Sequence, residues 1–113
     1  MNVFNLKQFQ MTVRTKRGRP SVILRGDVNE KAAWQLLKLL EKFQSSLYPI
    51  NLDVDGVGTI HWFAATILKS GFEHLLKSRG EIFLKQKRKK PKPVSDGNFS
   101  LIFSLANGGH DEV

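Results

Sequence analysis

Short apolar runs alternate along this chain with longer segments of helical periodicity, and this alternation restricts the chain to few folds. The runs lie within Ser21–Arg25, Ile50–Val54 and Glu81–Lys85. Val22, Ile23 and Leu24 form a continuous apolar run, which is typical of an interior strand that is covered on both faces, and we interpret the other two segments as interior strands too. Strands that alternate with helices pair in parallel through right-handed crossovers. The sequence therefore predicts an α/β domain in which these three strands are parallel.

Two segments between these runs carry apolar residues every three or four positions, which indicates one buried stripe on each of two helices. The first predicted helix extends from Glu30 to about Ser46, and the second extends from about Trp62 to Arg79. Asp27 is positioned to cap the first helix, and Asn29 is a competing cap. Both predicted helices therefore begin shortly after the end of a predicted strand.

Further elements are predicted towards both ends of the chain. Apolar and polar residues alternate over Phe9–Val13, which predicts a strand with one buried face. A short loop leads from it to Ser21–Arg25, so we expect this first strand to be an antiparallel edge. Near the other end, Phe99–Ala106 has the spacing of a short helix. The predicted fold is α/β, with a small mixed sheet of about four strands, an antiparallel edge, otherwise parallel pairing, and three helices.

Length and composition indicate one domain that needs no covalent or metal staples. A chain of 113 residues should bury about two-thirds of its unfolded surface, which is enough for one core. We expect a single domain over residues 1–113, a flexible basic loop at 85–97 and a mobile tail at 108–113. The sequence has no cysteine, which excludes disulfides and thiol nucleophiles and fits a reducing compartment.

The sequence gives no sign of export or of a bound cofactor. No signal peptide and no apolar run of about 20 residues is visible, so we expect a cytoplasmic location. His61 and His74 are not at metal-ligand spacing, and thiolate ligands are absent. We therefore expect neither a metal site nor a cofactor.

The charge of the chain favours acidic partners. Its 18 Lys and Arg residues against 10 Asp and Glu residues give a net charge of +8. The basic cluster within Lys85–Lys92 could bind nucleic acid, an anionic membrane or an acidic protein face, or be a solvated loop. A second cluster, within Arg14–Arg19, should lie at the opposite pole of a parallel sheet, which argues against one shared nucleic-acid groove. The candidate anion contacts are Lys87, Arg88, Lys89 and Lys90.

The stretch Asn51–Leu68 (NLDVDGVGTIHWFAATIL) is interpreted as a strand, an acidic glycine-rich turn and the start of a helix. Ligand sites in α/β sheets gather at such places. Its Asp53 and Asp55 also resemble the nucleophile motif of haloacid-dehalogenase-like phosphatases, which work with magnesium. Those enzymes carry the motif on their first strand and need further residues elsewhere. We expect instead that both carboxylates accept backbone amides in the turn, and that the chain is not an enzyme.

The element order and the segment LDVDGVGTIHWFAATIL resemble a STAS domain, the family of bacterial anti-sigma-factor antagonists and sulfate-transporter tails. The likeness covers about Ser21–Lys85. In the family, the pattern Asp-x-Ser-x-Val follows the strand and Asp-Ser-x-Gly opens the helix. The first pattern falls on Asp53–Val57, where Asp55 replaces the serine, and the second falls on His61–Ala64.

The second pattern carries the phosphoswitch of the antagonists in this family. A partner kinase phosphorylates its serine, and the phosphate breaks the complex. Here Trp62 stands at the serine position and His61 at the aspartate position, and an indole has no hydroxyl to phosphorylate. The resemblance therefore implies the scaffold without the switch. Thr59 could be a displaced acceptor, although a threonine before a helix usually caps it.

The resemblance implies a non-enzymatic regulatory module that binds another protein, either an anti-sigma kinase or a transporter subunit of a bacterial lipid-transport complex. We expect one of the rings of Trp62 and Phe63 to project into solvent. The alternative is that both fold into the core, Phe63 more surely. The alternative function is a basic adaptor for nucleic acid or anionic membrane through residues 85–92. The candidate partner-binding residues share the carboxyl edge of the predicted sheet: Asp27, Asp55, Thr59, His61, Trp62 and Phe63.

Overall fold

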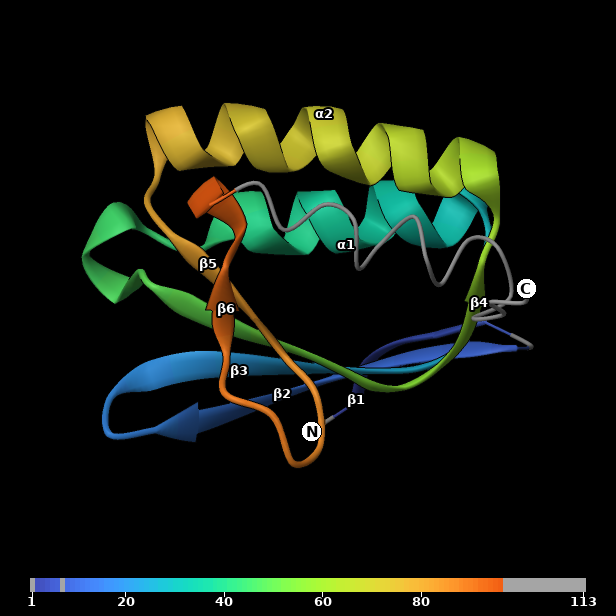
Figure 1. Cartoon of the computed structure of the whole chain (residues 1–113), viewed down its shortest axis with the longest axis horizontal. Helices are drawn as coiled ribbons and strands as arrows, with labels where there is room; N and C mark the ends of the chain where they lie inside the picture. The colour runs from blue at the N-terminus through green and yellow to red at the C-terminus, as the bar shows by residue number, and fades with distance from the viewer. Residues whose placement is uncertain (1, 7, 97–113) are drawn as a thin grey trace.

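The computed structural model describes residues 2–6 and 8–96, which form one mixed sheet with two α-helices above it (Figure 1). The strands lie side by side in chain order, from β1 at one edge to β6 at the other. The elements are β1 (Asn2–Leu6), β2 (Phe9–Lys16), β3 (Arg19–Val28), α1 (Glu30–Lys42), the 3₁₀ turn η1 (Ser45–Leu47), β4 (Ile50–Ile60), α2 (Trp62–Ser78), β5 (Ile82–Lys85), β6 (Lys92–Pro93) and the 3₁₀ turn η2 (Val94–Asp96).

The expected parallel pairing is confirmed for the three strands joined by helices. β3 pairs in parallel with β4, and β4 with β5, whereas the other neighbouring pairs are antiparallel. The two crossovers step across the sheet in the same direction, so crossovers of one hand place both helices on the same face. Figure 1 shows α1 and α2 together on one side of the sheet. The other face of the sheet carries no helix among the described residues.

This arrangement corrects the expectation of strands covered on both faces. Alternate residues of β3, such as Val22 and Leu24, are fully buried, whereas Ile23 between them is only half-buried. The same alternation runs through β4 and β5, where Asn51 and Phe83 lie on the uncovered side. The apolar run in β3 therefore does not indicate two covered faces. Ile23 is half-buried on a face that no described helix covers.

The core lies between the sheet and the buried stripes of the two helices. Leu36 and Leu40 of α1 and Leu68 and Phe72 of α2 are buried against the strands. The Oδ1 of Asn29 accepts a hydrogen bond of 2.8 Å from the backbone N–H of Ala32, which caps α1. The expectation that Asp27 caps this helix was wrong, and the competing candidate, Asn29, is the cap.

The strand and helix counts differ from the prediction at both ends. The sheet has six strands, because β1 pairs outside β2 and β6 pairs outside β5. β2 is antiparallel as predicted, but it is not an edge strand. Neither β1 nor β6 carries the apolar alternation by which sequence patterns reveal a strand. The predicted third helix at 99–106 and the predicted tail at 108–113 lie outside the described residues.

β4 is much longer than the predicted strand, which was expected to end in a turn after Val54. Asp53 pairs with Ile23 but Gly56 pairs with Arg25, so β4 contains one more residue than β3 between these pairs. A second irregularity of the same kind precedes Ile60. Such bulges bend a strand without ending it. Figure 1 shows the second half of β4 curving towards the helices before α2 begins.

Gly26 lets β3 run past the point where the sequence predicted its end. It has a φ of +96°, and a Cβ built on it would lie 2.0 Å from the backbone oxygen of Gln8. That oxygen accepts a 2.9 Å hydrogen bond from the N–H of Asp27. Only glycine fits both the positive φ and the close approach. Gly26 therefore helps to place Asp27 at the end of the strand.

We predict that Gly26→Ala lowers the free energy of unfolding by more than about 2 kcal/mol, because backbone strain adds to a steric clash with the Gln8 oxygen. Gly18→Ala is the matched control, since Gly18 also has a positive φ of +78° but has no atom within 4 Å of an added Cβ. Urea unfolding of both variants measures the difference. Equal losses in the two variants would contradict the role given to the contact with Gln8.

Tyr48 is a buried core residue near the C-terminal end of α1. Its hydroxyl donates a 2.7 Å hydrogen bond to the backbone oxygen of Leu40, and the residue is buried. Burial raises the pKa of Tyr48 to about 12; the Arg79 guanidinium opposes this shift and Glu41 adds to it. The folded protein therefore holds the phenol in its neutral form at pH values where an unfolded chain would begin to ionise it.

We predict that alkaline pH destabilises the wild type more than Tyr48→Phe. The contribution of the neutral phenol is fully present below pH 10 and is lost as pH rises towards about 12, because the unfolded chain releases its proton first. At neutral pH the variant should be less stable by about 1 kcal/mol, through the lost hydrogen bond. Urea unfolding from pH 8 to pH 11 measures this, and parallel pH profiles for the two proteins would refute the prediction.

Candidate functional site

Two aromatic side chains at the start of α2 lie in solvent. Trp62 is 58% exposed and Phe63 is 52% exposed, and their rings stack with centroids 4.5 Å apart and planes 19° apart. We expected one of these rings to be exposed, and both are. The alternative, in which both rings fold into the core, was wrong. Residues Ala64, Ala65 and Leu68 take the buried positions of α2 instead.

His61 fixes the local geometry of this stack. Its Nδ1 accepts a hydrogen bond of 3.3 Å from the N–H of Phe63, so His61 is the N-cap of α2. Its ring also lies 6.1 Å from the Phe63 ring at an angle of 22°. The assignment of the cap to Thr59 was wrong, because β4 extends to Ile60 and places Thr59 inside the strand.

Thr59 instead joins the ends of β3 and β4. Both its backbone N–H and its hydroxyl donate to the Oδ1 of Asp27, at 3.1 and 3.2 Å. These two residues, with His61 and Trp62, line a hollow of about 450 Å³ at this edge of the sheet. We call this the edge hollow; its other lining residues are Val28, Asn29 and Ile60. Four of the six predicted partner-binding residues therefore meet in one place, and Phe63 stacks on Trp62 beside it.

Asp55 lies apart from the edge hollow. It is part of β4 rather than of a turn, and its Oδ1 accepts a 3.1 Å hydrogen bond from the N–H of Lys87 in the loop between β5 and β6. Its own N–H donates to the Oδ1 of Asp53 at 3.0 Å, as expected for a carboxylate that satisfies a backbone amide. The four candidate anion contacts are all exposed in that loop: Lys87, Arg88, Lys89 and Lys90.

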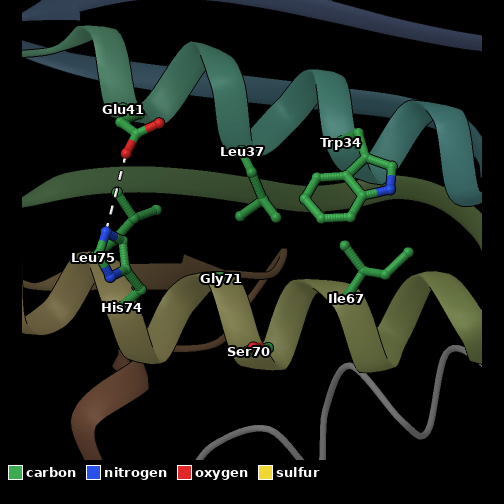
Figure 2. Close-up of a pocket in the computed structure, with 8 residues that line it drawn as sticks. All are labelled: Trp34, Leu37, Glu41, Ile67, Ser70, Gly71, His74 and Leu75. Carbon is green, nitrogen blue, oxygen red and sulfur yellow. Dashed lines mark ion pairs between the residues drawn. The ribbon is translucent and has the colours of Figure 1, made fainter.

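The structure adds an exposed aromatic residue that the sequence analysis missed. Trp34 on α1 is 54% exposed and lines a groove between α1 and α2 of about 430 Å³, which we call the helix groove (Figure 2). Figure 2 shows its indole across from Ile67 of α2, with Leu37 and Gly71 further along the groove. Trp34 falls beside the apolar stripe of α1 and not in it. A tryptophan at a helix position outside the buried stripe is the sequence signal that could have identified Trp34 as exposed.

Leu37 and Gly71 mark the place where the two helices come closest. A Cβ built on Gly71 would lie 2.4 Å from the methyl carbons of Leu37, so the glycine makes room for the leucine. At the far end of the groove, Nε2 of His74 lies 3.9 Å from a carboxylate oxygen of Glu41, and both side chains are exposed. An exposed ion pair of this length stabilises a fold very little. The groove therefore passes from an aromatic end to a polar end.

The exposed aromatic residues occupy one region of the molecule. α1 and α2 run parallel to each other and start at the same edge of the sheet, because each follows one of two parallel strands. Trp34 and Ile67 share the helix groove, and Phe63 and Ile67 are four residues apart on one helix face. We call Trp34, Trp62, Phe63 and Ile67 the aromatic surface. It contains all three exposed large hydrophobic residues of the described chain.

Other kinds of site find no support in the described part of the chain. No group of three or more His, Asp or Glu side chains lies close enough together to hold a metal ion. Neither α1 nor α2 has the length and apolar content that crossing a bilayer requires.

Comparison with known proteins supports the fold class. No protein-family model matches the chain, and no curated protein matches it. A solved structure described as "Crystal Structure Analysis of Mglu" is similar to this one, with a TM-score of 0.60 at 15% sequence identity. The match covers 69% of this chain, which spans about a fifth of the length of that protein (20%). At this identity the likeness shows a shared α/β fold and nothing about activity.

We predict that Asp27→Ala lowers the free energy of unfolding by about 1 kcal/mol, because it removes the acceptor of two hydrogen bonds from Thr59. A Cβ on Gly58 would lie 2.6 Å from the Asp27 Oδ1, so Gly58→Ala should be destabilising alone. In the Asp27→Ala background that clash is gone, and the second substitution should cost less. Urea unfolding of the four proteins measures the coupling, and additive losses would rule out the contact described here.

Proposed function

We propose that this chain is a non-enzymatic module that regulates another protein by binding it through the aromatic surface. The stacked and exposed rings of Trp62 and Phe63 are the observation that carries the proposal. A few side chains supply most of the binding energy at protein interfaces, and tryptophan is enriched among them. Three such side chains gathered over two neighbouring helix starts give a partner a large apolar contact area.

The proposed partner is a protein of the kind that STAS domains bind, an anti-sigma kinase or a subunit of a bacterial transport complex. The resemblance of Asn51–Leu68 to the STAS pattern supports this, as does an α/β sheet that places that stretch at the start of α2. The net charge of +8 favours a partner with an acidic face around the apolar contact. Such a role places the protein in the cytoplasm.

We propose that binding is constitutive, or is controlled by a route other than phosphorylation at the start of α2. Trp62 occupies the position of the switch serine and contributes contact area where the family places a phosphate. Thr59 is poorly suited as a substitute, because its hydroxyl donates to the carboxylate of Asp27. A phosphate at that position would meet a like charge.

We predict that Trp62→Ala weakens partner binding by more than about 30-fold, which corresponds to loss of a hot spot of at least 2 kcal/mol. The same change should alter the free energy of unfolding by less than about 1 kcal/mol, because the indole is largely in solvent. The measurement is affinity capture from cells of the source organism with quantitative mass spectrometry, followed by titration of the captured protein.

Trp34→Ala should lose the same partner, and Lys38→Ala on the exposed side of α1 is the control that should keep it. A partner that binds all variants equally would overturn the proposed surface. If binding is lost only in variants that also unfold at a lower urea concentration, the loss reflects destabilisation of the fold and contradicts the proposed surface. An Asp53→Asn variant that abolishes a magnesium-dependent phosphatase activity of the wild type would overturn the non-enzymatic assignment.

A further inference from the structure

The face of the sheet that no helix covers presents cations from three strands. Arg14 of β2, Arg25 of β3 and Lys85 of β5 each follow a residue that packs towards the helices, namely the partly buried Val13 and the buried Leu24 and Leu84. Successive residues of a strand point to opposite faces, so these three side chains share the uncovered face. None of the three makes an ion pair with another described residue. We call this face the open face.

Polar and aromatic side chains lie between these cations. The strand register aligns Arg14 with Ser21, Ser21 with Asn51, and Asn51 with Phe83 across four adjacent strands. The row therefore runs from a guanidinium through a hydroxyl and an amide to an aromatic ring that is half-buried. An aromatic ring on a sheet can stack on a base, and hydroxyl and amide groups can bond to base edges. Asp53 is an acidic residue of the open face, in register with Lys85, and the exposed Asp27 lies two residues after Arg25 on β3.

The open face also connects the two basic clusters. The turn between β2 and β3, with Lys16 and Arg17, lies at one end of the sheet, and the loop between β5 and β6 lies at the other. In Figure 1 the loop that carries residues 87–90 extends below the sheet, on the side away from the helices. The separation of the two clusters at opposite poles argues against one groove at a single pole that uses both of them. It does not argue against a strand laid across the sheet between them.

The dimensions of the open face suit a short single strand. Arg14 and Lys85 are three strands apart, or about 14 Å at the usual strand spacing of about 4.8 Å. An extended single strand spaces its phosphates farther apart than the duplex rise of about 3.4 Å, so this width accommodates only a few nucleotides. A bilayer fits this face less well, because surface binding relies on apolar side chains that insert into the lipid. The exposed aromatic side chains lie on the helix layer, and Ile23 and Phe83 of the open face are half-buried.

We propose that the open face binds single-stranded nucleic acid, with Arg14, Arg25 and Lys85 on the phosphates and Phe83 stacked on a base. This activity is separate from the protein binding proposed above, because the aromatic surface lies on the helix layer. Disruption of either surface leaves the other in place.

Fluorescence anisotropy with fluorescein-labelled ten-nucleotide oligo(dT) and oligo(rU) tests the proposal on the full chain. Three phosphate contacts predict a slope of log affinity against log salt near −2, from about −0.7 per contact. Affinity should therefore fall about 20-fold between 50 and 200 mM salt. The double variant Arg14→Gln/Arg25→Gln should weaken binding at least about tenfold and make the slope shallower by about 1.4.

Lys38→Gln/Lys77→Gln is the matched control, because it removes the same charge from exposed positions on the helices. It should change affinity by less than about twofold. Phe83→Leu should weaken binding about fivefold or more with an unchanged salt slope, since it removes a stacking ring and no charge. Circular dichroism checks that each variant is folded.

Three results would overturn the proposal. The first is no binding of either oligonucleotide at 50 mM salt. The second is an equal loss of affinity in the open-face variant and the helix control, which would indicate attraction by net charge alone. The third is binding to phosphatidylserine vesicles that depends on Arg14 and Arg25 without any binding of oligonucleotide, which would assign the open face to a lipid surface.

Discussion

The parallel pairing of β3 with β4 is the constraint on which the rest of the molecule depends. These are the two longest strands, and each feeds directly into a helix. Because they run in the same direction and their crossovers step the same way, both helices start at one edge and cover one face. Two hydrogen bonds from Thr59 to Asp27 join the two strand ends at that edge. One pairing thus determines where the aromatic surface forms and which face of the sheet is left open.

The aromatic surface is exposed because the core has no room for it. Leu36 and Leu40 of α1 and Leu68 and Phe72 of α2 already fill the layer between helices and sheet. Trp34 and Trp62 fall outside these stripes, so helical geometry directs them away from the sheet. Burying a side chain of this size in an interface is worth a few kcal/mol, which the folded chain alone does not gain. A partner that covers these rings would recover that free energy.

The two faces of the molecule offer different chemistry. On the helix layer, exposed rings and a groove between α1 and α2 suit an apolar contact. On the open face, Arg14, Arg25 and Lys85 stand among polar side chains and suit an anion. The aromatic surface is built from the helices and the open face from the strands beneath them, so a chain of 113 residues can carry two surfaces without a second domain.

Sequence periodicity predicted the elements that have a strong pattern and missed those without one. The strands after Ser21, the two helices and the parallel pairing follow from apolar spacing and from the order of elements. β1 and β6 have no such spacing, and the bulges of β4 depend on its pairing with β3, so neither could be predicted. The site was predicted where helix and strand meet, at His61 and Trp62. Trp34 was missed because its proximity to Ile67 exists only once the helices pack.

The central claim is that the exposed rings over the helix starts form a binding surface. Hydroxyl-radical footprinting of the chain, alone and with the captured partner, tests it most directly. Both tryptophans, Trp34 and Trp62, should be oxidised rapidly in the free chain and protected together in the complex, while Phe83 on the open face keeps its reactivity. A complex in which both indoles remain as reactive as in the free chain would contradict the account.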